Sequence, residues 1–391
     1  MKGFESVWRF LGLGWLDCLL VFFTGILLVP IWFRIRSGER KTWNEYYEMT
    51  TYMELLLCSF KRTGHIKIAL QDCQLVFRGR GKMGKAVGKA IHILESGEIE
   101  GEKSLIQSAL SEISRNYSCR RMKLMHHFIC RVERMGGDVA EALDILLSDL
   151  EMWKRRFILY HKKKQYIGRE CMMAAILAII LCGLSRLLIP VEFRESLYKH
   201  TVYRCSTIVV FTLLIGSATV IRYVTGRVQT QLSGEKKRKK QVEREFSYWL
   251  LSVTLYLQQN RLYYALLQSA EETEGMFRRE VYHLVEAIYQ NPTSLQPYLD
   301  FFSDLDLPEL RTGMKLLYAV NTNGYQDTKR QVHFLVEQNN AVLDRCEKEY
   351  YRMKIAGLRL LRQIPMMLAG GKIMLDMVVF LMIMADTISI F

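Results

Sequence analysis

Proline is scarce in this chain, and none lies between residues 31 and 189. That interval is rich in Leu, Met, Glu, Lys and Arg, which favour helices. Alternating apolar and polar runs joined by hairpin turns are also lacking. The composition therefore predicts an all-α chain and excludes a mainly β fold.

Paired cysteine motifs are missing as well. None of the nine cysteines belongs to a CxxC motif, and all lie in apolar runs or helical patterns. This is typical of a reducing compartment, in which cysteine acts as a small apolar side chain. Cys119, His126, His127 and Cys130 could supply zinc ligands, but a tetrahedral structural site usually takes ligand pairs from a turn as well. We therefore expect no metal site.

Residues arranged for catalysis are not found. No Ser/His/Asp or Cys/His set can be assembled, and the acid pairs at 271–272 and 347–349 have the pattern of solvated helix faces. Residues 79–86 nearly match the phosphate-binding loop GxxxxGK[ST], but Ala86 stands where a hydroxyl is needed and no apolar strand precedes it. We expect a flexible basic linker there, no cofactor and no enzymatic activity.

Four apolar runs dominate what is present: residues 11–33, 171–190, 205–221 and 364–391. Each approaches or exceeds the roughly 20 residues that a membrane-spanning helix needs. We predict four transmembrane helices, of which the central two form a hairpin. A cleaved signal peptide is the alternative for the first run, but that run is long for a signal and no A-x-A-like cleavage site follows it.

Two charged segments, the first arm (43–164) and the second arm (243–362), flank the hairpin with the apolar spacing of amphipathic helices. They look like versions of each other, because Gly64 in the first and Asn260 in the second are each followed five residues on by Ala-Leu. The predicted fold is an all-α membrane protein with four transmembrane helices and two repeated cytoplasmic helical bundles.

Basic residues gather where both arms approach the apolar runs, which predicts that both arms are cytoplasmic and both termini lie outside. The formal net charge of +14 suits anionic lipid, nucleic acid or an acidic protein. The candidate contact residues in these clusters are Lys162, Lys163, Lys164, Lys236, Lys237, Arg238, Lys239 and Lys240. They are most simply anchors to an anionic inner leaflet, each contributing about 1 kcal/mol. Docking to an acidic patch of a partner protein is the alternative, whereas no nucleic-acid-binding module is recognisable.

Lys372 and Asp376 interrupt the last apolar run. They are four residues apart, so they share one helix face and can pair, which lowers the cost of holding either charge in hydrocarbon. We expect this face to look into the protein or toward a neighbouring subunit. The alternative is that Lys372 reaches back to the inner interface and Asp376 accompanies it.

The best local match to a known pattern is residues 132–139, in which Glu133 precedes Gly136-Gly137 and an Ala-Leu pair follows. This resembles the Glu-x-x-Gly turn of the type II secretion system F family, and Gly64 with its Ala-Leu resembles that family's other short signal. The duplicated plan over residues 43–391 is similar too. The second arm departs from the pattern, since its turn at 323–324 lacks the upstream Glu.

The resemblance implies an inner-membrane platform protein of a type II secretion, type IV pilus or Tad pilus system. Such a protein would meet a separate hexameric secretion ATPase, pilin or pseudopilin subunits, other inner-membrane assembly proteins and further copies of itself. Glu133, Gly136 and Gly137 would belong to its contact surface. Two other classes stay open: a small oligomeric transporter or channel, and a membrane-tethered signalling scaffold.

Overall fold

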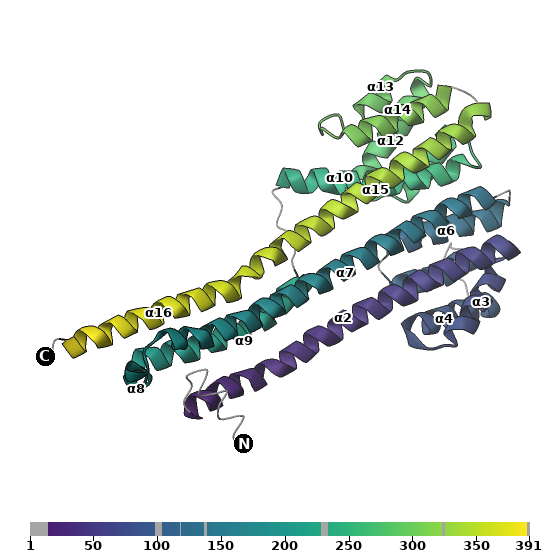
Figure 1. The fold of residues 1–391 in the computed structure, drawn as a ribbon. Coiled ribbons are helices and arrows are strands. Elements are labelled where there is room, and N and C mark those ends of the chain that lie inside the picture. The colour runs from purple at the N-terminus through teal and green to yellow at the C-terminus, as the bar shows by residue number, and fades with distance from the viewer. Residues whose placement is uncertain are drawn as a thin grey trace. The chain divides into compact units, whose positions relative to one another are not determined.

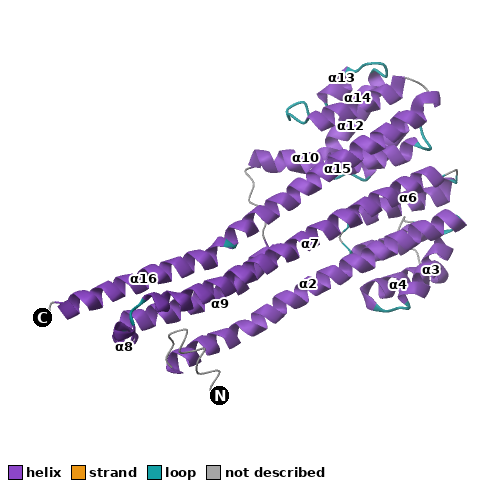
Figure 2. Cartoon of the chain, in the orientation of Figure 1, coloured by secondary structure: helices purple, strands orange, loops and turns teal. Residues whose placement is uncertain are grey.

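The computed structural model describes residues 15–97, 104–117, 119–136, 139–227, 234–322 and 325–388 (Figure 1). Every regular element in these ranges is a helix, which confirms the all-α prediction (Figure 2). The elements are α2 (Trp15–Thr63), α3 (Ile66–Phe77), α4 (Gly81–Ser96), α5 (Leu105–Asn116), α6 (Arg120–Met135), α7 (Ala140–Leu184), the 3-10 turn η1 (Ser185–Leu188), α8 (Val191–Lys199), α9 (Thr201–Arg227), α10 (Gly234–Leu257), α11 (Leu262–Glu271), α12 (Gly275–Gln290), α13 (Gln296–Asp300), α14 (Pro308–Thr322), α15 (Tyr325–Leu361) and α16 (Gln363–Ile388).

The chain divides into two compact units. The arm unit combines residues 43–157 with 231–350, and the apolar unit combines 1–42, 158–230 and 351–391. Three of these boundaries, at 42–43, 157–158 and 350–351, fall inside long helices, so α2, α7 and α15 each contribute residues to both units.

The apolar unit contains three helices long and apolar enough to cross a membrane among the described residues, within α2, α7 and α16. Four were predicted. The fourth, at 205–221, lies in α9, whose apolar stretch Thr201–Ser217 is shorter than a full span. The prediction of four transmembrane helices is therefore corrected to three candidates and one shorter apolar helix.

The boundary between α15 and α16 has a local cause. α15 ends at Leu361 and α16 begins at Gln363. Pro365 has no N–H to donate to the carbonyl four residues earlier, so the ladder of helical hydrogen bonds is interrupted at Leu361.

Both arms contribute to one continuous core in the arm unit. Its largest fully buried side chains include Tyr52 and Phe60 of α2, Phe128 of α6, Trp249 of α10 and Tyr298 of α13. Burying large aromatic groups supplies much of the stabilisation of such a core. The two arm segments thus share apolar packing within a single unit.

The basic stretch after Gly79 is helical, so its prediction as a flexible linker is wrong. α4 begins at Gly81, and a Cβ at Gly84 would lie 2.8 Å from the backbone carbonyl carbon of Gly79. Because glycine has no Cβ, the backbone of Gly79 can lie directly against the first turn of α4. This helical stretch has no preceding strand within the described residues and leaves Lys85 exposed, unlike a phosphate-binding loop.

Candidate functional site

A cleft of about 1320 Å³ in the arm unit takes its walls from both arms. α5 and α6 of the first arm line one side, and α10, α11 and α12 of the second arm contribute the rest. Small-molecule sites usually enclose roughly 300–1,000 Å³. The size and mixed polarity of this cleft therefore suit a segment of a partner protein.

Glu272 is the most perturbed acid of the cleft. Its carboxylate accepts hydrogen bonds from the hydroxyls of Ser252 and Tyr256. Burial raises its pKa to about 7, although these hydrogen bonds and the charges of Arg120 and Arg131 favour the ionised form. The expectation of a solvated face was therefore wrong for Glu272, whereas its neighbour Glu271 is exposed.

His126 lies at the cleft in a neutral, fully bonded state. Its Nε2 is hydrogen-bonded to the Tyr52 hydroxyl at 2.9 Å, and its Nδ1 to the Ser114 hydroxyl at 2.8 Å. Burial lowers the pKa of His126 to about 3. Both ring nitrogens are thus engaged by hydroxyl groups, and in the described part of the chain no three His, Cys, Asp or Glu residues are grouped to hold a metal ion.

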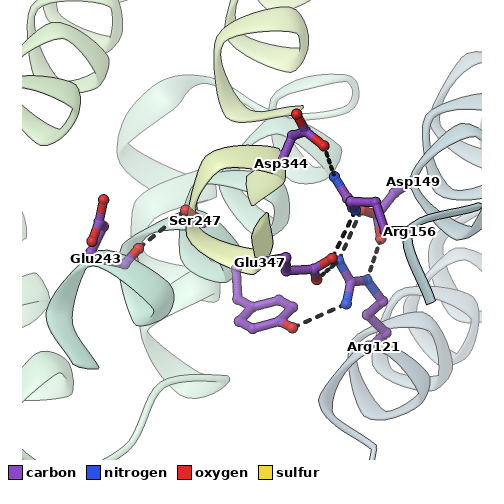
Figure 3. A network of polar contacts seen from close by, with 8 residues as sticks. Arg121, Asp149, Arg156, Glu243, Ser247, Asp344 and Glu347 are labelled. Carbon is purple, nitrogen blue, oxygen red and sulfur yellow. Dashed lines mark hydrogen bonds and ion pairs between the residues drawn. The ribbon is translucent and has the colours of Figure 1, made fainter. Parts of the chain in front are cut away.

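A buried polar joint connects the arms beside this cleft (Figure 3). Arg121 of α6 donates from Nε to Asp149 Oδ2 of α7 at 2.8 Å. It also donates to Glu347 Oε1 of α15 and to the hydroxyl of Tyr248 in α10, both at 3.1 Å. Burial by itself lowers the pKa of Arg121, but Asp149, Tyr248 and Glu347 raise it overall, so the guanidinium stays charged.

Arg156 of α7 extends this joint. Its Nε lies 2.7 Å from Glu347 Oε2, and its Nη1 lies 3.9 Å from Asp344 Oδ1. Figure 3 shows the two arginines converging on Glu347. Glu347 was expected on a solvated face, and that expectation is wrong because the side chain lies between two buried arginines.

Glu133 connects two sequence segments that are far apart along the first arm: the turn at Gly64 and the segment 132–139, whose patterns carry the family resemblance described above. Its Oε2 accepts a hydrogen bond at 3.1 Å from the backbone N–H of Ile66, the first residue of α3. The first turn of a helix leaves N–H groups without helical partners, and no side-chain cap is present at His65. Glu133 therefore caps, from another helix, the α3 turn that Gly64 begins.

Glycine is required at both ends of this arrangement. Gly64 has φ +71° and Gly136 has φ +69°, conformations that L side chains rarely adopt. The Gly136 N–H bonds to the Val132 carbonyl at 2.8 Å and closes α6. Gly137 and the corresponding 323–324 turn of the second arm lie outside the described residues.

The predicted basic contacts differ in their surroundings. Lys162 and Lys163 are exposed, whereas Lys164 lies 3.1 Å from Glu39. Arg238 pairs with Asp304 at 2.7 Å, and Lys239 and Lys240 are half-buried. Lys236 and Lys237 lie in α10, but their side chains are outside the described set.

Lys372 and Asp376 form a buried ion pair in α16 of the apolar unit, which confirms their predicted pairing. The Lys372 ammonium also lies 4.1 Å from the centre of the Tyr203 ring in α9. This contact places the charge over the ring face, where a cation is attracted. The pair is therefore turned into the protein, and its role in contacting a partner stays a prediction.

Comparisons with protein-family models, curated proteins and solved structures find no match to this chain. The functional argument therefore rests on the geometry above. Sequence reasoning missed the cleft and the polar joint. Arg121 and Arg156 stood in an ordinary charged helical pattern, and only their shared burial separates them from surface arginines.

Proposed function

We propose that this chain is a platform scaffold in the cytoplasmic membrane, coupling a separate hexameric secretion ATPase to the assembly of pilin or pseudopilin subunits. The observation that carries the proposal is the continuity of α2 and α7. Each has an apolar stretch long enough to span a membrane and, in the same unbroken helix, residues buried in the core of the arm unit.

Continuous helices are suited to transmitting movement. α2 has 49 residues, of which those up to 42 belong to the apolar unit and those from 43 onward to the arm unit. The polar joint and the shared core tie the two arms together, so a force applied to either arm would act on both. ATP hydrolysis belongs to the partner in this scheme, and the chain itself needs no catalytic residue.

The cleft between the arms is the proposed docking place for the ATPase or another assembly protein. Its lining includes the exposed Lys123 and Arg278 and the half-buried Glu272, whose pKa burial raises to about 7. The exposed Lys162 and Lys163 would contact anionic lipids of the inner leaflet. Other inner-membrane assembly proteins and further copies of the chain complete the proposed assembly.

The test is cross-linking of the tagged full-length chain in its native membrane, followed by identification of the linked proteins. A secretion ATPase and prepilin-like proteins are the expected partners. Lys123→Glu in the cleft should weaken the ATPase link several-fold, whereas Lys67→Glu, an exposed lysine of α3 outside the cleft, should not. Filament assembly or secretion that continues normally after deletion of the gene would overturn the proposal.

A small oligomeric transporter or channel is the second candidate, favoured by the buried charge pair Lys372–Asp376 in an apolar helix. Ionisable residues within membrane helices often mark transport pathways. Purified protein in liposomes should then carry ions or solutes without a partner, and this flux should disappear in Asp376→Leu. The platform proposal expects no such flux.

A further inference from the structure

A groove in the apolar unit lies between α7 and the beginning of α16. It encloses about 790 Å³ and is bordered by Met173 and Leu177 of α7 and by Met366 and Met367 of α16. Three of these side chains are more than 45% exposed, so this apolar lining is open to the surroundings of the helices. The volume lies within the roughly 300–1,000 Å³ typical of small-ligand sites.

One end of the groove is charged. Arg362, which follows α15, lies 3.1 Å from Glu170 of α7. Arg169 and Tyr166 stand at the same end, both exposed, and Arg169 has no ion-pair partner within the described part of the chain. Two arginines against one glutamate leave this end with one net positive charge.

Both helices run from the charged end toward the apolar end. On α7 the chain passes Arg169 before Met173 and Leu177, and on the other side it passes Arg362 before Met366. Leu177 lies eight positions after Arg169, which is about 12 Å along a helix. One leaflet of a membrane has a hydrocarbon depth of about 15 Å, half of the full core. The groove thus has the polarity and the length of a lipid in a single leaflet.

We propose that this groove binds one anionic glycerophospholipid. Its phosphate-bearing head group contacts Arg169 and Arg362, with the Tyr166 hydroxyl beside it, and one acyl chain lies along Met173, Leu177 and Met366. Guanidinium groups suit phosphate because they donate several hydrogen bonds in one plane. The site rests on the membrane placement that belongs to the proposed function, but it needs no filament machinery.

The experiment is native mass spectrometry of the full-length chain, delipidated in detergent and then incubated with phosphatidylglycerol or with phosphatidylcholine of the same acyl chains. We expect one phosphatidylglycerol retained in preference to phosphatidylcholine. Arg169→Gln and Arg362→Gln should each weaken retention about fivefold, the effect of one basic residue near a membrane surface. Lys67→Gln removes one positive charge from an exposed position of α3, outside both the groove and the predicted lipid contacts, and should change little.

A second pair of variants distinguishes the contribution of the groove's volume to lipid retention from that of the arginine charges. Ala174→Trp fills the groove and should abolish retention with both arginines intact, whereas Met172→Trp, on an exposed neighbouring position outside the groove, should not. Equal retention of the two lipids, or retention unaffected by the arginine and Ala174 variants, would show only annular lipid and overturn the site. A different result would be a dimer of the wild-type chain that is lost in Ala174→Trp, together with no preference for phosphatidylglycerol. That result would show that a second copy of the chain occupies the groove, and it would also overturn the lipid site. Because lipid retention and filament assembly are measured separately, either proposal can fail alone.

Discussion

Glu133 links two turns of the first arm, one at Gly64 and one at Gly136, by a hydrogen bond. It stands 67 residues from Ile66, whose N–H it accepts. Burial raises the pKa of Glu133, while the Ile66 hydrogen bond opposes that rise. A single carboxylate thus joins α6 to the beginning of α3.

Glu133→Ala should destabilise the arm unit by about 1 kcal/mol, the usual effect of losing a helix N-cap. Glu133→Gln keeps an acceptor oxygen and should recover much of the loss. The measurement is thermal unfolding in detergent followed by circular dichroism. Glu95→Ala, on an exposed position of α4, is the control. A fall in melting temperature in Glu95→Ala as large as that in Glu133→Ala would contradict the capping role.

Glu272 should make stability depend on pH. Its folded pKa of about 7 lies above its ordinary value of 4.5, so the folded state holds the proton more tightly than the unfolded state. The resulting contribution of Glu272 to the free energy of unfolding is complete below pH 4.5 and is lost as the pH rises toward 7. Glu272→Gln remains neutral throughout. Relative to this variant, the wild type should lose roughly 2 to 3 kcal/mol between pH 4.5 and 8.

Unfolding of the two proteins at pH 5 and pH 8 checks this. Glu271→Gln removes the neighbouring exposed carboxylate and should follow the wild-type pH dependence. A constant difference between wild type and Glu272→Gln at both pH values would rule out the raised pKa.

Lys372 and Asp376 should depend on each other. Lys372→Leu or Asp376→Leu alone leaves a buried charge without its main partner, at a cost of roughly 3 kcal/mol on membrane-insertion scales. Each single variant should accumulate poorly in membranes, and the double variant should recover expression without recovering filament formation. Asp386→Leu, an exposed acid of the same helix, is the control. Normal filaments in both single variants and in the double variant would show that the Lys372–Asp376 pair is not part of the functional site.

At the scale of elements, the polar joint makes α6, α7, α10 and α15 dependent on one another (Figure 3). A buried ion pair adds little net stability compared with apolar packing, but removing one partner is costly because the other charge is left buried. The joint therefore favours one particular arrangement of the arms over alternatives that would separate these charges.

Arg121→Met should cost about 3 kcal/mol, and so should Asp149→Leu. The double variant should lose clearly less than the sum of the two, because neither charge is then left unpaired. Chemical unfolding of the solubilised chain measures all three. Arg155→Met breaks an exposed pair with Glu151 and should cost under about 1 kcal/mol. Additive losses in the double variant would mean that Arg121 and Asp149 act independently.

At the scale of the whole molecule, the basic clusters predict one orientation in a membrane. We expect both arms to be cytoplasmic. After replacement of the nine native cysteines, a cysteine at Asn291 should be protected from an impermeant reagent added outside, and one at Tyr198 should react. Labelling at Asn291 in intact cells would reverse the predicted topology. A cysteine at Tyr289, exposed in α12 of the same arm, should behave as Asn291 does.

The sequence by itself determined the features that depend on neighbours along the chain. Helical periodicity predicted the helices, Gly64 and Gly136 marked turns that need positive φ, and the spacing of Lys372 and Asp376 predicted their pairing. These are local properties, because the helix repeat places residues four apart on one face. The same local reasoning failed at Gly84, where glycine permits a close approach within a helix and does not mark a linker.

The tertiary structure alone decided which distant residues meet. Arg121 and Glu347 are 226 positions apart, and the walls of the cleft come from helices of both arms. Within the sequence of one arm, a lysine or arginine on a solvated helix face looks the same as one that the other arm covers in the folded protein. The packing of the two arms around one core buries Arg121 and Arg156 and leaves Glu272 half-buried. Removal from water is the physical reason for the charge pairing of the two arginines and for the raised pKa of Glu272.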